Sequence, residues 1–256
     1  LADGVDNLQL GSLQGGVSIN APKGYDYGTI WGSDFVYSPT GEKVVGENGA
    51  YLISSTSDNN LGSYQAKWFG GLRNTFNYKN LSFSFLVDWK KGGKVFSLDQ
   101  YYGQASGLYD DSVFINDLGN PVRNSLANGG GVILPGVINT GTAANPVYSP
   151  NNIRIDAEKT NANGYLAYPA SQFVYDASYI KLREVALTYT LPKKYLASTF
   201  VQGASFSLVG NNLWIIQKHI PYADPESGLS AGNAQGYQTS VLPTTRVVSF
   251  NIRLNF

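Results

Sequence analysis

The last twelve residues, 245–256, alternate between apolar and polar side chains. The apolar positions are Val248, Phe250, Ile252, Leu254 and Phe256, and the polar positions are Ser249, Asn251, Arg253 and Asn255. A period of two places all the apolar side chains on one face of a β-strand. A tilted strand needs about 9–11 residues to cross a bilayer, so the length also fits. Because the stretch ends on the aromatic residue itself, it predicts the closing strand of a transmembrane β-barrel.

The same alternation predicts four earlier strands, at 67–79, 81–98, 173–191 and 204–216. The first two form a hairpin around the tight turn at 78–80. We expect the apolar faces of this hairpin and of the closing strand to contact lipid. The residues expected to face lipid are Phe83, Phe85, Val87, Phe250, Ile252, Leu254 and Phe256.

The third of these strands changes the parity of its apolar positions in the middle. They are even up to Leu182 and odd from Val185 onward. One extra residue in a strand produces such a change, because every later side chain then moves to the opposite face. We therefore expect a β-bulge near Arg183 and Glu184.

The connections between the predicted strands are very unequal in length. Short ones lie around Asn80 and at 192–203, and long ones lie at 100–172 and 217–243. Short and long connections alternate along the chain, which is typical of outer-membrane barrels with short periplasmic turns and long outer loops. Both long connections are therefore predicted to be extracellular.

Residues 1–63 are less regular than 64–256, which carries the strands and the long loops. We interpret 1–63 as a partly irregular region of strand and loop. Within it, 28–37 and 43–53 are predicted to form a hairpin around the turn residues that lie between them.

The composition narrows the fold class and the possible functions. Charged residues make up 14% of the 256 residues, and the 29 glycines and 18 tyrosines suit an all-β protein with long polar loops. The net charge of zero, without a basic block, excludes the electrostatic footprint of a nucleic-acid binder. The absence of cysteine excludes disulfides and thiolate metal sites. The chain starts at Leu1 without a signal sequence, and we interpret it as a piece of a longer exported polypeptide.

An ordered set of short segments runs through 25–256. They are 28–32 (GTIWG), 39–42 (PTGE), 68–76 (WFGGLRNTF), 81–85 (LSFSF), 92–93 (GG), 175–185 (YDASYIKLREV), 189–192 (YTLP), 210–213 (GNNL), 224–226 (DPE) and the terminal Phe256. In order and spacing this set resembles the C-terminal third of SusC/RagA-like TonB-dependent transporters, the nutrient importers of Bacteroidota outer membranes. The chain departs from the family pattern before Trp68, where the family has an Asn-Pro-rich turn and this chain has SYQAK.

The resemblance implies a plugged barrel of the 22-stranded type, of which this chain supplies about the last five or six antiparallel strands. It implies a place in the cell outer membrane, in contact with lipid, and a SusD-like surface lipoprotein that acts as a lid. Oligosaccharides or peptides are then captured under the lid and pass when the TonB complex displaces the plug. No segment here matches the family's plug or TonB box, so contact with TonB is expected through an N-terminal part that this sequence lacks.

Candidate catalytic and metal-binding residues are few. The single histidine, His219, cannot make a multi-histidine zinc site, and no nucleophile elbow accompanies it. The acidic pair Asp110 and Asp111, like the pair Asp224 and Glu226, matches neither an EF-hand loop nor a glycosidase. We interpret the first pair as solvated and the second as shaping its loop. The sequence therefore predicts no enzyme, no cofactor and no metal site.

Several charged residues lie on the predicted strands rather than in loops. They are Asp88, Lys90, Lys181, Arg183 and Arg253. The inner face of a large barrel is polar by default, so contact with the plug is the ordinary interpretation of these positions.

The two long loops are rich in tyrosine, whose ring offers an apolar face with a polar tip. Such rings suit the faces of sugars and protein interfaces alike, and those near strand ends also suit the aromatic girdles of a barrel. We predict that loop tyrosines and one acidic pair contact the substrate or the lid. These residues are Tyr101, Tyr102, Tyr109, Tyr165, Tyr222, Asp224, Glu226 and Tyr237.

Two alternatives remain open at the level of the sequence. A soluble β-sandwich that binds glycans would bury its alternating apolar faces in a closed core, whereas a barrel exposes a continuous apolar band. A glycoside hydrolase would need two carboxylates that converge in one cleft.

Overall fold

The computed structural model describes residues 3–228, 232 and 235–256. They form two compact units, each built from separate stretches of the chain. Unit 1 consists of Leu1–Gln65, Lys94–Tyr175 and Gly228–Val241, and unit 2 consists of Ala66–Gly93, Asp176–Ser227 and Leu242–Phe256. The predicted loop at 217–243 includes 229–231 and 233–234, which lie outside the described residues.

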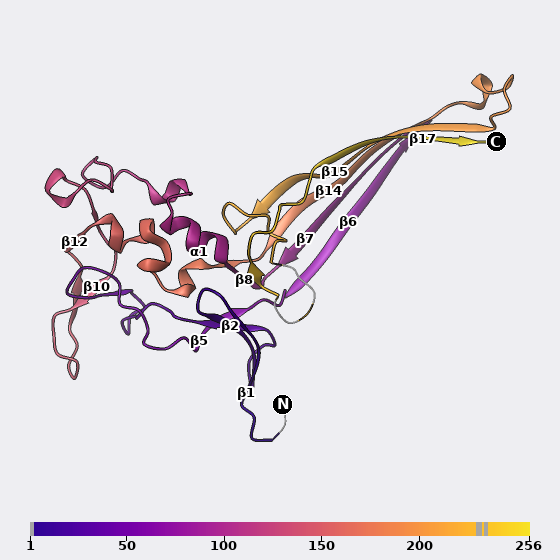
Figure 1. Cartoon of the computed structure of the whole chain (residues 1–256). Helices are drawn as coiled ribbons and strands as arrows, with labels where there is room; N and C mark the ends of the chain where they lie inside the picture. Colours follow the sequence, from indigo (N-terminus) through magenta and orange to yellow (C-terminus); the bar gives the residue numbers. More distant parts are fainter. Residues whose placement is uncertain (1–2, 229–231, 233–234) are drawn as a thin grey trace. The chain divides into compact units, whose positions relative to one another are not determined.

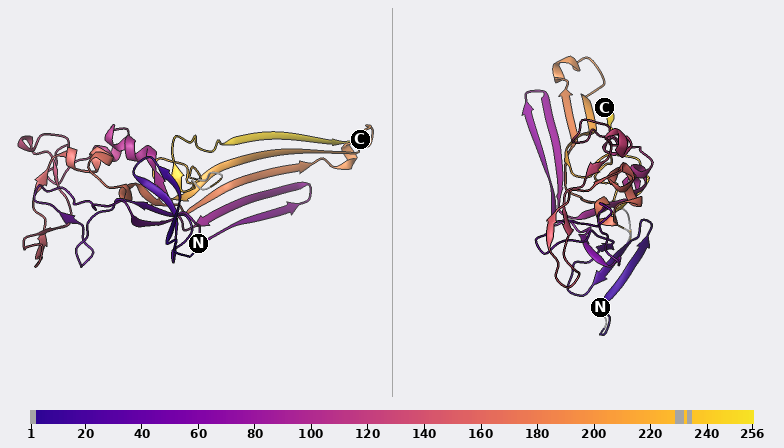
Figure 2. Two further views of the ribbon diagram at one scale, coloured as in Figure 1. Left: turned by 60° about the horizontal axis from the view of Figure 1, so that its bottom comes forward. Right: turned by 90° about the vertical axis from the view of Figure 1, so that its left-hand side faces the viewer.

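Unit 2 is built on an antiparallel sheet of five long strands, which run side by side in Figures 1 and 2. The strands are β6 (Trp68–Tyr78), β7 (Leu81–Lys91), β14 (Tyr179–Thr190), β15 (Gly203–Lys218) and β17 (Val247–Asn255). Their order is β17-β15-β14-β7-β6, so each strand pairs with the strands that precede and follow it in this unit. Consecutive strands of a barrel wall run in this way. The all-β prediction is confirmed.

Two predicted strands are each divided in the structure. The predicted strand 81–98 leaves the β region at Gly92 and Gly93, whose φ angles are 80° and 85°. It therefore becomes β7 and a separate β8 (Lys94–Ser97), which belongs to unit 1. The predicted strand 173–191 becomes β13 (Val174–Asp176) and β14, which are separated at 177–178.

The predicted β-bulge is present in β14. The register of this strand shifts between Leu182 and Glu184 against both of its neighbours, β7 and β15. Arg183 is the extra residue opposite β7, and Asn212 is the extra residue that β15 inserts opposite β14, with a φ of 51°. Nη1 of Arg183 donates a hydrogen bond of 3.1 Å to Oδ1 of Asn212, so the two bulges are joined.

The strand register gives the sheet one apolar and one polar face. Residues directly opposite one another on neighbouring strands share a face. One apolar row crosses all five strands through Phe76, Phe83, Leu187, Leu208 and Phe250. The adjacent row on the other face is polar and consists of Asn77, Ser82, Thr188, Ser207 and Asn251. The apolar face is exposed within unit 2, since Phe76 is 56% exposed and Phe250 is 64% exposed.

Unit 1 combines short sheets with a helix. Its largest sheet has the order β1-β2-β3-β5, with β1 (Asn7–Leu13), β2 (Val17–Pro22), β3 (Thr29–Gly32) and β5 (Asn59–Ser63). The helix α1 (Leu98–Ala105) begins after Ser97, whose Oγ accepts a hydrogen bond of 3.3 Å from the backbone N–H of Gln100. Among the described residues, no helix is both long enough and apolar enough to cross a membrane.

The remaining elements are short. The other strands are β4 (Val44–Val45), β9 (Val132–Ile133), β10 (Val137–Asn139), β11 (Tyr148–Pro150), β12 (Arg154–Ile155) and β16 (Tyr237–Gln238). They form sheets of order β11-β10-β4, β12-β9 and β13-β8-β16. The single-turn helices are η1 (Asp110–Ser112), η2 (Leu126–Asn128), η3 (Ala157–Lys159), η4 (Asn161–Leu166), η5 (Ala170–Phe173) and η6 (Lys193–Tyr195).

Unit 1 has a hydrophobic core of its own. Ile19, Ile30, Phe96 and Phe173 are buried in it and come from two of the three stretches of the chain that form the unit. The structure therefore groups residues differently from the sequence interpretation, because the predicted loop at 100–172 folds together with the N-terminal region. Long-range packing between these stretches leaves no periodic signal in either one.

The predicted hairpin at 28–37 and 43–53 is formed only in its inner part. Antiparallel bridges join Tyr37 with Lys43 and Phe35 with Ile53. The first part of the predicted arm is instead β3, which pairs with β2 and β5. The reason is that β3 lies inside a four-stranded sheet, where both of its edges already have partners.

Candidate functional site

Four of the predicted tyrosines lie together in unit 1. Tyr101 and Tyr102 are on α1, Tyr165 is on η4, and Tyr237 is on β16. The ring of Tyr101 stacks on that of Tyr165 with centroids 4.9 Å apart, and Tyr102 meets both rings edge to face at 5.1 Å. The sequence predicted each of these residues separately, and the fold brings them into one cluster.

Two local features allow η4 and β16 to approach this cluster. Gly164 has a φ of 55°, and a Cβ at this position would lie 2.8 Å from the backbone N of Ala105 on α1, so only glycine fits there without displacement. On the other side, the ring of Phe96 stacks on Tyr237 at 5.6 Å and also contacts Tyr101 at 5.6 Å. The buried Phe96 therefore joins the cluster to the core of unit 1.

The cluster borders an open cleft of about 590 Å³ in unit 1. The hydroxyl of Tyr102 accepts a hydrogen bond of 2.9 Å from Nε2 of Gln14, and the hydroxyl of Tyr237 donates one of 2.9 Å to the backbone oxygen of Gln14. Tyr109, the fifth predicted tyrosine of unit 1, also lines this cleft. Tyr102 is 39% exposed, so its ring is accessible to a ligand.

Among the described residues that line the cleft, Asp99 is the only one with a charged side chain. Its Oδ1 accepts a hydrogen bond of 2.8 Å from the backbone N–H of Ser240, and its Oδ2 accepts one from the side chain of Gln238. Burial, together with the nearby Tyr102 and Asp99, raises the pKa of Tyr237 to about 12. Burial and then Asp99 also raise the pKa of Tyr109. The phenols of Tyr109 and Tyr237 are therefore neutral at neutral pH, and the carboxylate of Asp99 makes the local potential unfavourable for a negative charge.

The sequence did not single out Gln14, Asp99 or Ser240 as cleft residues. A signal for the helix was present, because Ser97 followed three residues later by Gln100 is the pattern of a helix start. This pattern places Asp99 in the first turn of the helix, and not in a solvated loop. The contribution of Gln14 comes from a stretch far away in sequence and has no comparable signal.

The acidic pair of the second loop lies in unit 2 and is used within the protein. Nζ of Lys181 lies 2.9 Å from Oδ1 of Asp224 and 2.5 Å from Oε2 of Glu226. Arg183 binds Glu226 through two hydrogen bonds, of 2.9 Å and 2.8 Å, and also binds Asp88. The arrangement supports the interpretation that 224–226 shapes its loop. Contact of Asp224 or Glu226 with a substrate or lid stays a prediction, as does that of the exposed Tyr222.

The protonation states of the pair follow from these contacts. Burial by itself would raise the pKa of Asp224, but hydrogen bonds from Thr244 and Lys181 hold it at about 2. Burial acts in the same upward direction on Glu226, and the hydrogen bonds from Arg183 and Lys181 lower its pKa in spite of it. Both carboxylates are therefore ionised at neutral pH and neutralised by the two cations.

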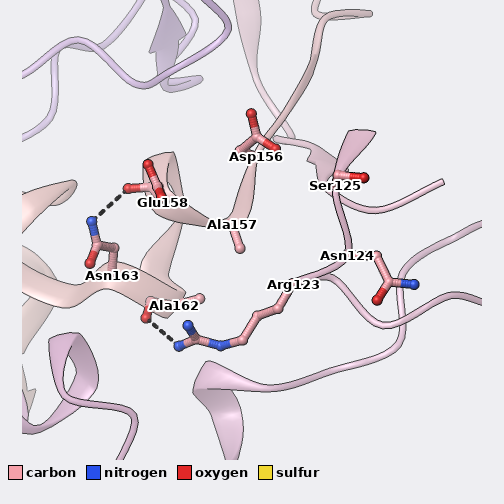
Figure 3. Close-up of a pocket in the computed structure, with 8 residues that line it drawn as sticks. All are labelled: Arg123, Asn124, Ser125, Asp156, Ala157, Glu158, Ala162 and Asn163. Carbon is pink, nitrogen blue, oxygen red and sulfur yellow. Dashed lines mark hydrogen bonds between the residues drawn. The ribbon is translucent and has the colours of Figure 1, made fainter. Parts of the chain in front are cut away.

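A second pocket of unit 1, of about 420 Å³, is drawn in Figure 3. Arg123 points across it and donates hydrogen bonds to the backbone oxygens of Ala162, at 3.0 Å, and Ser112, also at 3.0 Å. Asn163 donates to the backbone oxygen of Glu158 at 2.9 Å. The guanidinium and the amide thus hold the surrounding loops. None of the predicted site residues lines this pocket.

The predicted lipid-facing residues are all on the strands or the terminus of unit 2. Phe83, Phe250, Ile252, Leu254 and Phe256 are exposed there, and Phe85 and Val87 are half-buried by neighbouring side chains. Within the described part of the chain, no group of three His, Cys, Asp or Glu residues is placed to hold a metal ion.

Comparisons with known proteins find related transporters. TonB-dependent receptor P26 of Formosa agariphila is 26% identical over 222 residues, which are 84% of this chain and 20% of the relative. TonB-dependent receptor P3 of the same organism is 23% identical over 260 residues, which are 95% of this chain and 23% of the relative. No protein-family model matches the chain.

Solved structures agree on the fold. The RagAB peptide transporter superposes on the whole chain with a TM-score of 0.60 at 17% identity, over 25% of its own chain. The RagAB peptide importer in its "open-open" state gives a TM-score of 0.57 at 18% identity, again over 25% of its chain. The chain thus spans about a fifth to a quarter of the length of these proteins. The resemblance predicted from the sequence is confirmed: the chain is similar in sequence to TonB-dependent receptors and in fold to part of a RagA-like TonB-dependent barrel transporter.

Proposed function

We propose that this chain supplies the C-terminal wall strands and outer loops of a TonB-dependent outer-membrane nutrient importer. The observation that carries the proposal is the exposed apolar face of the five-stranded sheet. In a soluble β-sandwich that face would be covered by a second sheet, whereas Phe76 and Phe250 are open to solvent in unit 2. In a barrel the same face meets lipid.

The dimensions of the face support this role. Aromatic residues mark both of its ends, with Trp68, Trp89 and Trp214 at one end and Tyr78, Tyr189 and Phe206 at the other. On β7, the row of Trp89 and the row of Leu81 are about 26 Å apart along the strand at about 3.3 Å per residue. A strand tilt of about 40° shortens this to about 20 Å, close to the roughly 25 Å apolar band between two aromatic girdles.

The direction of the strands follows from the connections. Lys79 and Asn80 join β6 to β7, and a short connection joins β14 to β15 at the same end of the sheet. The chain leaves the opposite end for the long connections after β7 and β15. We place the short turns in the periplasm and the long connections outside the cell, as in other barrels of this kind.

Recognition in this proposal belongs to the cleft beside Tyr102 and Tyr109. Tyrosine rings provide apolar contact area at modest entropic cost, and the uncharged Gln14 and Ser240 supply hydrogen-bonding groups at the cleft. The carboxylate of Asp99 favours neutral or positively charged groups of a peptide or an oligosaccharide over anionic ones. RagAB, which has a similar fold, is a peptide transporter. A SusD-like lipoprotein is the partner that we propose for the outer loops.

Uptake in a strain that depends on the importer tests this proposal. The double variant Tyr102→Ala/Tyr109→Ala removes two rings that line the cleft and should reduce uptake of the nutrient at unchanged surface abundance. The matched control is Tyr25→Ala, because Tyr25 is 65% exposed in the same unit and does not line the cleft. Equal uptake by the double variant and the control would remove the cleft from recognition.

A further inference from the structure

A pocket of about 440 Å³ lies on unit 2 at the tryptophan end of the apolar face. Trp68, Trp89 and Ile180 form its apolar part. Ile180 is directly opposite Trp89, and the two indoles meet edge to face at 6.2 Å. The pocket therefore belongs to the surface that faces lipid in the proposed barrel, at the level of the outer aromatic girdle.

The polar part of the same pocket is basic. Lys90, Lys91 and His219 line it. Lys90 is opposite Tyr179 on the polar face and interacts with Asp176, so Lys91, opposite Trp68, is the lysine on the side of the indoles. Lys91 and His219 are exposed, so both can meet a ligand at the rim. One further cation lies in the adjoining chain, because the side chain of Lys67 packs against Gly92. An anionic group is therefore favoured beside the indoles.

We propose that this pocket binds an outer-leaflet lipid through its phosphorylated headgroup, with an acyl chain along Trp68, Trp89 and Ile180. The inference rests on the proposed function, since the apolar face must be in the membrane for a lipid to reach it. A free phosphate uses the lysines alone, whereas a lipid uses both parts of the pocket. The continuity of the indoles with the apolar rows of the sheet selects the lipid.

The contributions of the two parts are separable. Lys91 attracts the phosphate, and a lysine near a charged lipid surface contributes about fivefold in affinity, equivalent to about 1 kcal/mol. Trp68 contacts the acyl chain and the glycerol or sugar region, as indoles do at membrane interfaces. Loss of either residue should weaken lipid binding, and only the loss of Lys91 should weaken the preference for a phosphorylated lipid.

Lipid retention by the full-length importer that contains this chain tests the proposal. The protein is purified in detergent, mixed with phosphorylated lipid A or its dephosphorylated form, and examined by native mass spectrometry. The unaltered protein should retain the phosphorylated form preferentially. Lys91→Gln should weaken retention by about fivefold, and Trp68→Ala should weaken retention of both forms. Lys194→Gln, at an exposed lysine of the short turn, is the matched control.

Three results would overturn the proposal. The first is equal retention of the two lipids, and the second is equal loss in Lys91→Gln and Lys194→Gln. The third is complete displacement of the lipid by inorganic phosphate, which would identify a free-anion site. A protein that stays monodisperse without detergent would instead refute the membrane-spanning sheet itself. If any of the three results is found with a protein that still imports nutrient, only the lipid site is refuted.

Discussion

The ammonium group of Lys181 lies 2.9 Å from Oδ1 of Asp224, and the two side chains are 2% and 3% exposed. Their positions are 43 residues apart in the chain, so this ion pair fixes a loop onto the wall strand β14. Glu226 and Arg183 extend the pair into a network on the polar face of the sheet. The loop that carries Tyr222 is thereby held near its start by charges that the strand supplies.

Replacing Lys181 by Met should release this loop. Two carboxylates would then be left with fewer partners in a buried place, and breaking a buried pair in this way costs about 3–5 kcal/mol. We expect faster proteolysis within 219–246 and a lower midpoint of denaturant unfolding. Lys193→Met serves as the control, since Lys193 is exposed in the short connection between β14 and β15. Identical proteolysis of the two variants would mean that the ion pair does not hold the loop.

The same network should show a defined dependence on pH. The pKa of Asp224 in the folded protein is about 2, below its ordinary value of 3.8. Its contribution to stability is therefore present above about pH 4 and is lost as the pH falls toward 2. Hydrogen exchange of the backbone at 224–227 should stay slow at pH 5 and accelerate as pH 2 is approached. Asp224→Asn should be faster already at pH 5, and a variant as slow as the unaltered protein there would contradict the assignment.

The two faces of the closing strand should respond oppositely to a charge. Ile252 shares the apolar face with Phe206, whereas Asn251 pairs with Ser207 on the polar face. Val248 lies on the same face as Ile252, four residues farther from the aromatic end, so Val248→Arg should lower folding stability in a bilayer by about 2–4 kcal/mol. Asn251→Arg should be tolerated, because Asn251 lies on the polar face of the sheet. Equal damage from the two changes in a membrane-folding assay would refute the assignment of faces.

Single cysteines can test the proposed direction of the strands, since the chain contains none of its own. Ala143 is exposed in the long connection between β7 and β14, and Ser198 is exposed in the short connection between β14 and β15. A membrane-impermeant maleimide added to intact cells should label Ala143→Cys and leave Ser198→Cys unlabelled. Disrupted cells provide the control, where both should react. Labelling of Ser198→Cys alone in intact cells would invert the topology.

The strands of unit 2 could be predicted because the sheet has one apolar and one polar face. This difference gives the apolar residues of each strand a period of two, and the bulge at Arg183 could be predicted because it interrupts that period. The pairing of Lys181 with Asp224 left no such trace, since it depends on how a loop folds back. The core of unit 1 was hidden for a similar reason. Phe96 stacks on Tyr237, and the sequence around either residue does not indicate that the two rings meet.

The sequence indicated that tyrosines would form the candidate site, but not which of the predicted residues would lie in the same unit. Tyrosines in long loops indicate recognition, and five of the predicted ones, namely Tyr101, Tyr102, Tyr109, Tyr165 and Tyr237, belong to the same unit. Tyr222, Asp224 and Glu226 belong to the other unit. The sequence placed Asp224 and Tyr237 in the same loop, and the division between the units runs through that loop.

The bulge in β14 has a consequence for how this wall tolerates insertions and deletions. Arg183 separates two lengths of one strand whose side chains follow opposite parities, with Leu182 before it and Val185 after it on the same face. Deleting Arg183 would remove the offset, and one half of the strand would have to exchange its two faces, with Lys181 on the apolar face of the sheet and Ile180 on the polar face. Loss of a residue from the turn at Ser198 carries no such inversion. The one residue at position 183 therefore determines which side chains of β14 lie on each face of the sheet.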